Sequence, residues 1–232
     1  PDAPTLQDML AQMVNSGCGS VAMEVSSHSL DQERVHGIDF DVAVFTNLTG
    51  DHLDYHHTME RYFEAKWRLF QLLGSGSKKG IALINTDDEW GRKLKERGIR
   101  GTVLTFGMSG SPDVRILDPA VSAAGSTFRL ETPWGGRPVK TNMVGRYNIV
   151  NAATAISACA AAGIPFDLAC DTVAAASAVP GRLQEVPLNA GFRVFVDYAH
   201  THDALENVLG TLREVTEGRL VAVFGCGGNR DR

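Results

Sequence analysis

The strongest constraint on the fold is the alternation of short apolar runs with segments of helical periodicity. The apolar runs of strand length are residues 20–25, 41–47, 81–85 and 102–107. Apolar side chains recur at helical spacing over residues 58–73, and a polar helical pattern covers 88–97. Because parallel strands need a crossover between them, usually a helix, this order predicts an α/β fold. We expect a mostly parallel sheet that helices cover on both faces.

The pattern changes after residue 112 and again after residue 179. Residues 112–143 contain short β-type runs around a Pro/Gly turn, which predicts a small antiparallel sheet. Two alanine-rich helices are predicted next, at about 148–162 and 167–178. The Pro/Gly-containing segment 179–187 indicates a domain boundary, so we assign residues 1–182 to one domain and 183–232 to the start of another. In the second part we expect strand 192–198, helix 203–215 and strand 220–225, as at the beginning of a βαβ unit.

Composition narrows the class of protein. The chain has 232 residues, 44% of them hydrophobic, which is enough apolar material for a sizeable core. The net charge of −5 argues against a nucleic-acid-binding protein, whose usual mark is a basic face. Its longest apolar runs have strand length and are too short to span a membrane. The four cysteines have no zinc spacing, and we expect reduced thiols in a cytosolic protein.

Polar residues gather where strands are predicted to end. Glu24 closes the run 20–25, and Asn47 closes the run 41–47. The loop that follows contains the metal-capable residues Asp51, His52, Asp54, His56 and His57. Ligands of parallel sheets bind outside the carboxyl ends of the strands, so these residues lie where a site is expected. Taken alone, Glu24 is better explained by a solvent-exposed position at the rim of the sheet than by a functional role. One histidine with carboxylates suits magnesium better than zinc.

Lys66 interrupts the apolar stripe of the helix predicted over residues 58–73. Its ammonium group can reach water while its aliphatic stem covers the core. Alternatively it pairs with a carboxylate such as Asp51 or Asp54. A third interpretation is that the neutral amine carries carbon dioxide as a carbamate, since burial favours the neutral amine. Spacing alone does not choose among these interpretations.

Six motifs in fixed order identify a family resemblance. They are MEVSSHSLDQERVHG, TNLTGDHLDYHHTMERYFEAKWRLF, VGRYNIVNA, VPGR, VDYAHTHDAL and FGCGGNRDR. Together they resemble the Mur ligases, and among these the ligases that add the third peptide residue to UDP-N-acetylmuramoyl-L-alanyl-D-glutamate. The resemblance implies that residues 1–182 are a P-loop-NTPase-like central domain and that 183–232 begin a Rossmann-like C-terminal domain. No GxxxxGK[ST] phosphate loop occurs in the chain, and the family's loop would precede Pro1.

The resemblance also implies roles for individual residues. Glu24 and His52 match magnesium ligands, and Lys66 matches a carbamylated lysine that also binds magnesium. Ser26, Gln32 and Arg34 match residues that bind the UDP-muramoyl-peptide. The nucleotide contacts implied are Asn148, Arg182 and Asp197, the last one to the ribose, with Tyr198 and His200 in the same motif.

Four positions depart from the family pattern. His202 replaces a proline, Gln184 a glutamate, Asn229 an aspartate and His57 a glycine. None of these belongs to the implied metal set. We expect the loop after Asp197 to differ in shape because of His202.

The implied function is ATP-dependent amide bond formation in peptidoglycan precursor synthesis, through an acyl phosphate. The implied cofactor is Mg²⁺, and ATP, the UDP-muramoyl-dipeptide and a free amino acid are the partners of a cytoplasmic, monomeric enzyme. Residues 1–232 by themselves are expected to be inactive. The alternatives are another Mur-type or folylpolyglutamate-synthase-like ligase, a metal-dependent hydrolase, or a non-catalytic nucleotide-binding fragment.

Overall fold

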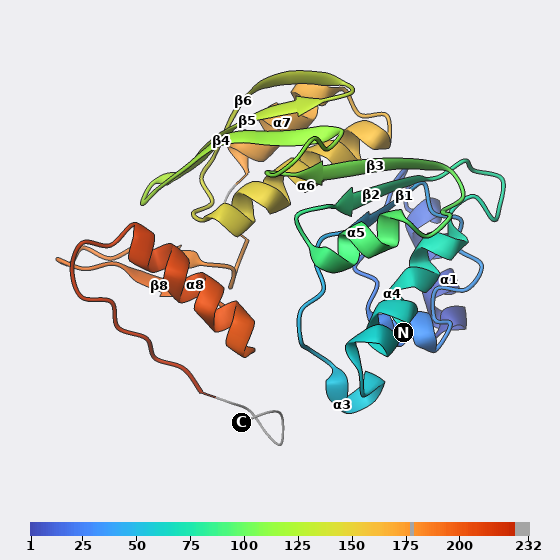
Figure 1. The fold of residues 1–232 in the computed structure, drawn as a ribbon, viewed down its shortest axis with the longest axis horizontal. Coiled ribbons are helices and arrows are strands. Elements are labelled where there is room, and N and C mark those ends of the chain that lie inside the picture. Colours follow the sequence, from blue (N-terminus) through green and yellow to red (C-terminus); the bar gives the residue numbers. More distant parts are fainter. Residues whose placement is uncertain (177–178, 226–232) are drawn as a thin grey trace. The chain divides into compact units, whose positions relative to one another are not determined.

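A computed structural model describes residues 1–176 and 179–225, and six of its strands form one sheet. They are β1 (Val42–Phe45), β2 (Ile81–Asn85), β3 (Thr102–Gly107), β4 (Val114–Ser122), β5 (Gly125–Thr132) and β6 (Gly135–Thr141), hydrogen-bonded in sequence order (Figure 1). β1 pairs with β2 and β3 with β4 in parallel, whereas β4, β5 and β6 are antiparallel. The predicted α/β class is confirmed, and the antiparallel strands extend the same sheet.

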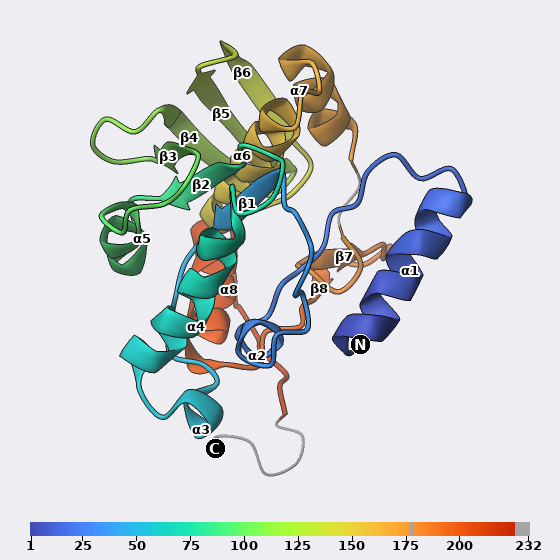
Figure 2. The same cartoon turned by 90° about the vertical axis from the view of Figure 1, so that its right-hand side faces the viewer.

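The chain divides into two compact units, Pro1–Leu104 and Thr105–Arg232, each with its own helices. The helices of the first unit are α1 (Ala3–Asn15), α2 (Ser27–Asp31), α3 (Leu53–His56), α4 (Met59–Leu72) and α5 (Glu89–Lys95). Side chains of α4 and α5, including Phe70 and Leu94, pack with Phe45 and Ile84 of the strands in one apolar core. The short helix α2 contacts α4 (Figure 2).

Helix α4 begins and ends close to its predicted bounds because local signals define it. Thr58 is its N-cap, and the Thr58 hydroxyl accepts a hydrogen bond of 3.2 Å from the backbone N–H of Arg61. Glu60 lies in the first turn, where a negative charge interacts favourably with the helix dipole. Tyr62, Phe63 and Phe70 are buried on the face that meets the sheet. Lys66 therefore projects from a helix whose position is well determined by packing.

The second unit combines strands β4–β6 with two helices and a C-terminal segment. Helix α6 (Arg146–Ala161) packs on β4 and β5, and α7 (Phe166–Ala175) packs on β6. The C-terminal segment contains β7 (Gln184–Val186), β8 (Val194–Val196) and α8 (His202–Glu214). Val144, Leu183 and Leu212 form a small apolar cluster that joins this segment to the start of α6. A Cβ at Gly145 would lie 2.7 Å from Cγ2 of Thr211, so glycine permits this close approach.

Two predicted strands do not form in the described part of the chain. Residues 20–25 are extended without strand pairing, and Glu24 is exposed instead of closing a buried strand. Residues 220–225 are likewise unpaired, and Val223 is 97% exposed. A strand needs a hydrogen-bonded neighbour, and neither segment has one among the described residues. The predicted strand 192–198 and helix 203–215 form as β8 (Val194–Val196) and α8 (His202–Glu214), and β8 pairs antiparallel with β7, so only the second strand of the expected βαβ unit is unpaired.

Three further observations bear on the sequence predictions. The sequence did not indicate α2 or α3, which have five and four residues. Cys18, Cys159 and Cys170 are free thiols, while Cys226 and Asn229 lie outside the described residues. Within residues 1–176 and 179–225, no helix is both long and apolar enough to cross a membrane.

Candidate active site

The predicted substrate residues Ser26, Gln32 and Arg34 lie on and just after helix α2. Ser26 is the N-cap of α2, and its hydroxyl accepts a hydrogen bond of 3.1 Å from the N–H of Ser29. Gln32 is the C-cap, and its amide oxygen accepts a hydrogen bond from the Arg34 guanidinium. A serine cap is what such a short helix needs, because its first N–H groups have no partner within the helix. Gln32 and Arg34 thus form one polar pair at the end of α2.

The histidine-rich loop leads into helix α3. His52 has a left-handed backbone (φ 57°), its N–H donates to Asp51 Oδ1 at 2.8 Å, and its Nε2 lies 3.5 Å from Asp51 Oδ2. His57 follows α3 with φ 65°, a conformation that glycine adopts without strain. The loop directs His52 toward α2, and the His28 and His52 ring centroids are 5.0 Å apart.

Lys66 is half-buried beside two carboxylates. Burial lowers the pKa of Lys66, and the negative charges of Glu24 and Asp51 oppose this shift. The same two carboxylates act on Tyr62, whose pKa is raised to about 12 mainly by burial. The Lys66 ammonium nitrogen is 5.7 Å from the centroid of the Tyr62 ring. Lys66, Glu24 and Asp51 therefore form one electrostatically coupled group with Tyr62.

The chemistry of this group fits magnesium in the kind of donor that it offers. Carboxylate oxygens and one imidazole are available from Glu24, Asp51 and His52, and magnesium prefers oxygen ligands and retains water. Among the described residues, however, no three His, Cys, Asp or Glu side chains converge closely enough to form a metal site by themselves. Lys66 is the cationic side chain next to these carboxylates, so its charge bears directly on any cation bound here.

A second group of predicted residues lies in the second unit, around Asp197. The Asp197 carboxylate accepts hydrogen bonds from the backbone N–H groups of Leu183 (2.6 Å) and Ala199 (2.7 Å). The N–H of Tyr198 donates to the carbonyl of Gly181 at 2.9 Å. These bonds join the PGR segment (180–182) to the DYAH segment (197–200). The Arg182 guanidinium lies 5.4 Å from the centroid of the Tyr198 ring. These two predicted nucleotide-binding residues are therefore neighbours.

His200 and Asn148 have separate local partners. His200 contacts the carbonyl of Tyr198 through Nδ1 at 2.9 Å. Asn148 is buried in the first turn of α6, and its side-chain amide donates to the Val144 carbonyl at 2.9 Å. Beside it, burial raises the pKa of Tyr147 to about 12, with a smaller contribution from the charge of Asp197. The sequence did not predict a role for Tyr147, and its place beside Asn148 in the VGRYNIVNA motif was the only indication that it lies near the site.

Two of the departures from the family pattern are accommodated locally. Gln184 accepts a hydrogen bond of 2.9 Å from the N–H of Gly181, as a glutamate at that position could. His202 is the first residue of α8, which Thr201 caps through a 3.2 Å hydrogen bond from the N–H of Ala204. A proline suits the first helical position, but the helix also begins there without one.

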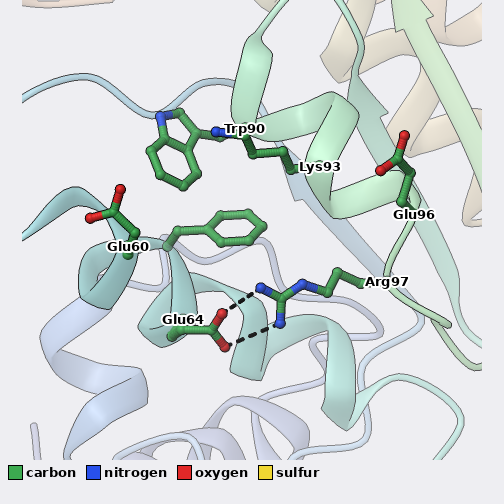
Figure 3. A pocket seen from close by; sticks show the side chains of 7 residues that line it. Glu60, Glu64, Trp90, Lys93, Glu96 and Arg97 are labelled. Carbon is green, nitrogen blue, oxygen red and sulfur yellow. Dashed lines mark hydrogen bonds and ion pairs between the residues drawn. The ribbon is translucent and has the colours of Figure 1, made fainter.

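Two of the surface pockets lined by described residues of the first unit differ in their relation to the predicted residues. One, of about 460 Å³, contains none of them and is lined by Glu60, Phe63, Glu64, Trp90, Lys93, Glu96 and Arg97 (Figure 3). Its wall is closed by the bidentate pair of Arg97 with Glu64. The other, of about 370 Å³, lies next to α2 and α3 and is lined by Asp31, Tyr55, His56, His57, Arg61, Glu64, Ala65 and Arg68. Neither lining includes Glu24, His52 or Lys66, so the candidate site is identified by the charges and donor groups of these residues and not by the size of a pocket.

Comparison with known proteins finds similarity to Mur ligases along the whole chain. Residues 1–159 match the family model of the Mur ligase middle domain, and residues 181–232 match that of the Mur ligase glutamate ligase domain. The UDP-N-acetylmuramoyl-L-alanyl-D-glutamate–2,6-diaminopimelate ligase of Bacillus velezensis is 44% identical over 235 residues. The ligase of the same name from Geobacter metallireducens is 46% identical over 235 residues. The alignments cover 100% of this chain but only 48% and 46% of those relatives, so the chain spans about half their length.

Solved structures give the same result. A structure of a UDP-N-acetylmuramoyl-L-alanyl-D-glutamate–2,6-diaminopimelate ligase superposes with a TM-score of 0.80 and 37% identity, covering 100% of this chain and 47% of that one. The MurF ligase of Thermotoga maritima in complex with ADP has a TM-score of 0.63 at 23% identity, over 75% of this chain and 39% of its own, and shares the fold. The chain belongs to the Mur ligase family.

Proposed function

We propose that the full-length protein carrying this chain is an ATP-dependent ligase. It joins 2,6-diaminopimelate to the glutamyl carboxyl group of UDP-N-acetylmuramoyl-L-alanyl-D-glutamate. The observation that carries the proposal is the half-buried Lys66 between the charges of Glu24 and Asp51, in the same unit as the Gln32–Arg34 pair. The choice of diaminopimelate rests on the names of the 42–46% identical relatives.

The reaction has two steps. A carboxylate oxygen of the glutamyl group attacks the γ-phosphorus of ATP, the bond to the β–γ bridging oxygen breaks, and ADP leaves. The neutral amine of the amino acid then attacks the acyl carbon, phosphate leaves, and the nitrogen loses a proton. Charge accumulates on the transferred phosphoryl oxygens, so fixed positive charge contributes most to the rate.

Lys66 is proposed to act as a carbamate. Its neutral amine attacks the carbon of carbon dioxide and loses a proton, which converts a cationic side chain into an anion with two oxygens. Burial supports this step because it lowers the pKa of Lys66 and increases the neutral fraction. Glu24, His52 and the carbamate would then hold magnesium, whose positive charge would stabilise the phosphoryl oxygens.

The remaining predicted residues are proposed to bind the two large substrates. Ser26, Gln32 and Arg34 would contact the UDP-muramoyl-dipeptide, where Arg34 can form a bidentate contact with a carboxylate or phosphate. Asn148, Arg182, Asp197, Tyr198 and His200 would contact ATP. The proposed domain boundary follows Arg182, and the enzyme is proposed to act as a cytoplasmic monomer.

The decisive experiment is a coupled assay of the full-length protein. Phosphate release is measured with ATP, the UDP-muramoyl-dipeptide and diaminopimelate together and with each one omitted, and the product is identified by mass spectrometry. We expect release only with all three and a tripeptide product. Turnover that does not need ATP would indicate a hydrolase, and binding without turnover would indicate a non-catalytic protein; either result contradicts the proposal. Lysine in place of diaminopimelate tests the amino acid.

A further inference from the structure

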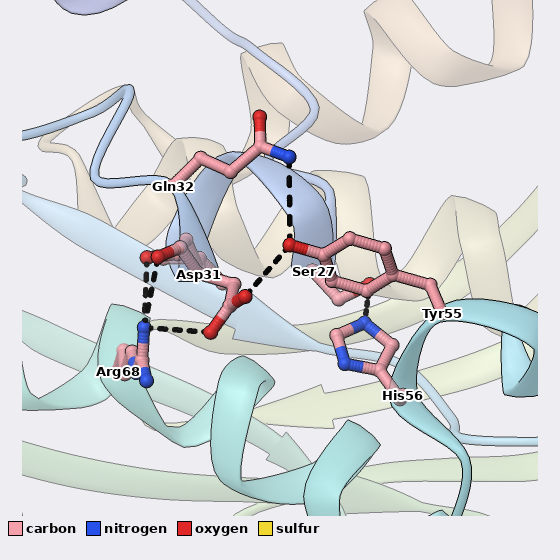
Figure 4. A network of polar contacts seen from close by, with 7 residues as sticks. Ser27, Asp31, Gln32, Tyr55, His56 and Arg68 are labelled. Carbon is pink, nitrogen blue, oxygen red and sulfur yellow. Dashed lines mark hydrogen bonds and ion pairs between the residues drawn. The ribbon is translucent and has the colours of Figure 1, made fainter.

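A chain of polar contacts connects the Gln32–Arg34 pair to helices α3 and α4, and Figure 4 shows its part from Gln32 through Tyr55 and Asp31 to Arg68. Arg34 donates to the amide oxygen of Gln32, and the Gln32 amide nitrogen donates to the Tyr55 hydroxyl at 3.4 Å. The Tyr55 hydroxyl donates to Asp31 Oδ2 at 2.7 Å, and Arg68 pairs with Asp31 Oδ1 at 3.0 Å. The five side chains come from three helices and their ends. No sequence motif indicated that Tyr55 and Arg68 would meet this segment.

The Tyr55 hydroxyl determines which way the Gln32 amide points. A hydroxyl has one proton, and this one is donated to Asp31, so toward Gln32 it can only accept. The amide must therefore present its nitrogen to Tyr55 and its oxygen to Arg34. A flipped amide would place two donors together at Arg34. The orientation of Arg34 thus depends on a residue that is 21 positions away in the sequence.

Arg68 fixes the C-terminal end of α2. Besides its ion pair with Asp31, its guanidinium donates to the backbone carbonyls of Leu30 (3.4 Å) and Asp31 (3.1 Å). The last carbonyls of a helix have no partner within the helix, and a side-chain donor can satisfy them. Arg68 lies on α4, about one helical turn before Leu72, the last residue of that helix. Through this residue α4 determines where α2 ends.

A buried contact anchors the other end of α2 to α3. His56 Nε2 lies 2.9 Å from the Ser27 hydroxyl, and the His56 ring stacks on Tyr62 at 5.1 Å. This contact is buried, whereas the Asp31 and Arg68 side chains are 37% and 47% exposed. An exposed ion pair stabilises a fold by only about 0–1 kcal/mol. The exposed Arg68–Asp31 pair therefore contributes little to the free energy of unfolding, and its main effect is on the direction of the side chains after α2.

We propose that Tyr55 and Arg68 are positioning residues for the UDP-muramoyl-peptide substrate. They hold Gln32 and Arg34 at a fixed place relative to α4, the helix that carries Lys66. This inference rests on the proposed function and extends it to residues that do not contact substrate themselves. It explains why a tyrosine and an arginine occupy α3 and α4 beside a pocket of about 370 Å³ without forming part of the metal group.

The test uses Tyr55→Phe and Arg68→Lys in the full-length enzyme. Tyr55→Phe removes only the hydroxyl, and we expect the KM for the UDP-muramoyl-dipeptide to rise about tenfold, as for the loss of one or two oriented hydrogen bonds. The KM for ATP and the Tm should stay close to the wild-type values. Arg68→Lys keeps the charge and loses the fork geometry, so a smaller increase in the same KM is expected.

Arg97→Gln is the matched control. It removes an arginine–carboxylate pair to the same helix α4, through Glu64, together with guanidinium contacts to the α4 rings of Phe63 and Trp67. The KM for the UDP-muramoyl-dipeptide, the KM for ATP and the Tm should all stay close to the wild-type values in this variant. An active wild type with an unchanged dipeptide KM in Tyr55→Phe would overturn the inference and leave the proposed function standing. Equal rises in both KM values, or a lowered Tm, would show a structural role and also overturn it. An inactive wild type would overturn the proposed function itself.

Discussion

Asp197 and Leu183 are joined by a hydrogen bond of 2.6 Å from the Leu183 backbone N–H to the Asp197 carboxylate. The other carboxylate oxygen accepts from Ala199, so both oxygens are engaged with backbone groups. One side chain thereby holds together two loops that contain Arg182 and Tyr198. An aspartate in this position orders the loops and still presents a negative charge beside Arg182.

Asp197→Asn should weaken ATP binding and the folding of this segment. The amide has one acceptor oxygen, so one of the two N–H groups would face a donor and lose its bond. Leaving a partly buried donor unpaired costs about 1–3 kcal/mol. We expect a lower Tm and a higher KM for ATP in the full-length enzyme, with little change in the KM for the UDP-muramoyl-dipeptide. Steady-state kinetics with each substrate varied separately measures this difference.

Glu185→Gln is the control for Asp197→Asn. Glu185 lies on β7 in the same segment and forms an exposed pair with Arg193 at 2.6 Å. Surface pairs of this kind contribute about 0–1 kcal/mol, so the variant should have nearly wild-type kinetics. If both variants raise the KM for ATP equally, Asp197 has no special role in the nucleotide site.

Arg34→Ala should act on the other substrate. A charge-assisted, bidentate contact to a carboxylate or phosphate is lost, while the backbone of α2 keeps its Ser26 cap. Hydrogen bonds to charged groups contribute about 1.5–3 kcal/mol, which corresponds to a rise in KM of roughly ten- to a hundredfold for the UDP-muramoyl-dipeptide. The KM for ATP should change far less. Comparable changes in both constants would contradict a substrate contact at Arg34.

His56 should make stability depend on pH. Burial, assisted by the nearby His28, lowers the pKa of His56, while Asp31 acts in the opposite direction. Above the unfolded-state pKa of about 6.5 the ring is neutral in both states. As the pH falls through that value, the unfolded chain binds a proton that the native ring resists. Stability therefore decreases from about pH 6.5 down to the lower folded-state pKa. The Tm measured at a series of pH values should show this slope.

His56→Gln should reduce the slope below pH 6.5, since glutamine does not titrate. The matched control is His202→Asn, because the His202 side chain is 97% exposed on the first turn of α8 and its removal should leave the slope unchanged. An identical pH dependence in wild type and His56→Gln would exclude His56 as its source.

Local signals were sufficient to predict much of the fold. Helix α4 was predicted from its apolar spacing and from Thr58, and the structure has that cap and those buried positions. Strand β2 was likewise predicted from its apolar run. The run 20–25 looked the same in sequence but lacks a strand partner among the described residues, and pairing is not a local property. Short helices such as α2 carry too few residues for a periodic signal.

A residue of the candidate site could be predicted where its chemical type is unusual for its position in the sequence. Lys66 is a charge on an apolar stripe, and the structure gives it two carboxylate neighbours in Glu24 and Asp51. Tyr55 and Arg68 are not unusual at their positions in the sequence, because an exposed arginine and a loop tyrosine are both common. Their importance arises from contacts with Asp31 that span 24 and 37 residues, and these follow only from the packing of α2 on α4.

Lys66 provides the sharpest prediction. If its function is to carry a carbamate, alanine at this position should nearly abolish ligase activity, because the anionic donor beside Glu24 and Asp51 is lost. In the wild type, ¹³C-bicarbonate should give a carbamate carbon signal by NMR that is absent in Lys66→Ala. This readout does not depend on turnover, so it separates modification of the lysine from its role in the reaction.

Lys66→Arg distinguishes the carbamate from an ordinary lysine. A guanidinium stays positively charged and forms no stable carbamate, so activity should be almost as low as in the alanine variant. A lysine that only covers the core with its stem predicts the reverse, since arginine retains both stem and charge. Acetate or formate, entering the space left in Lys66→Ala as an anion, should restore part of the activity there and none in Lys66→Arg. Near-wild-type turnover by Lys66→Arg would refute the carbamate and return Lys66 to a structural role.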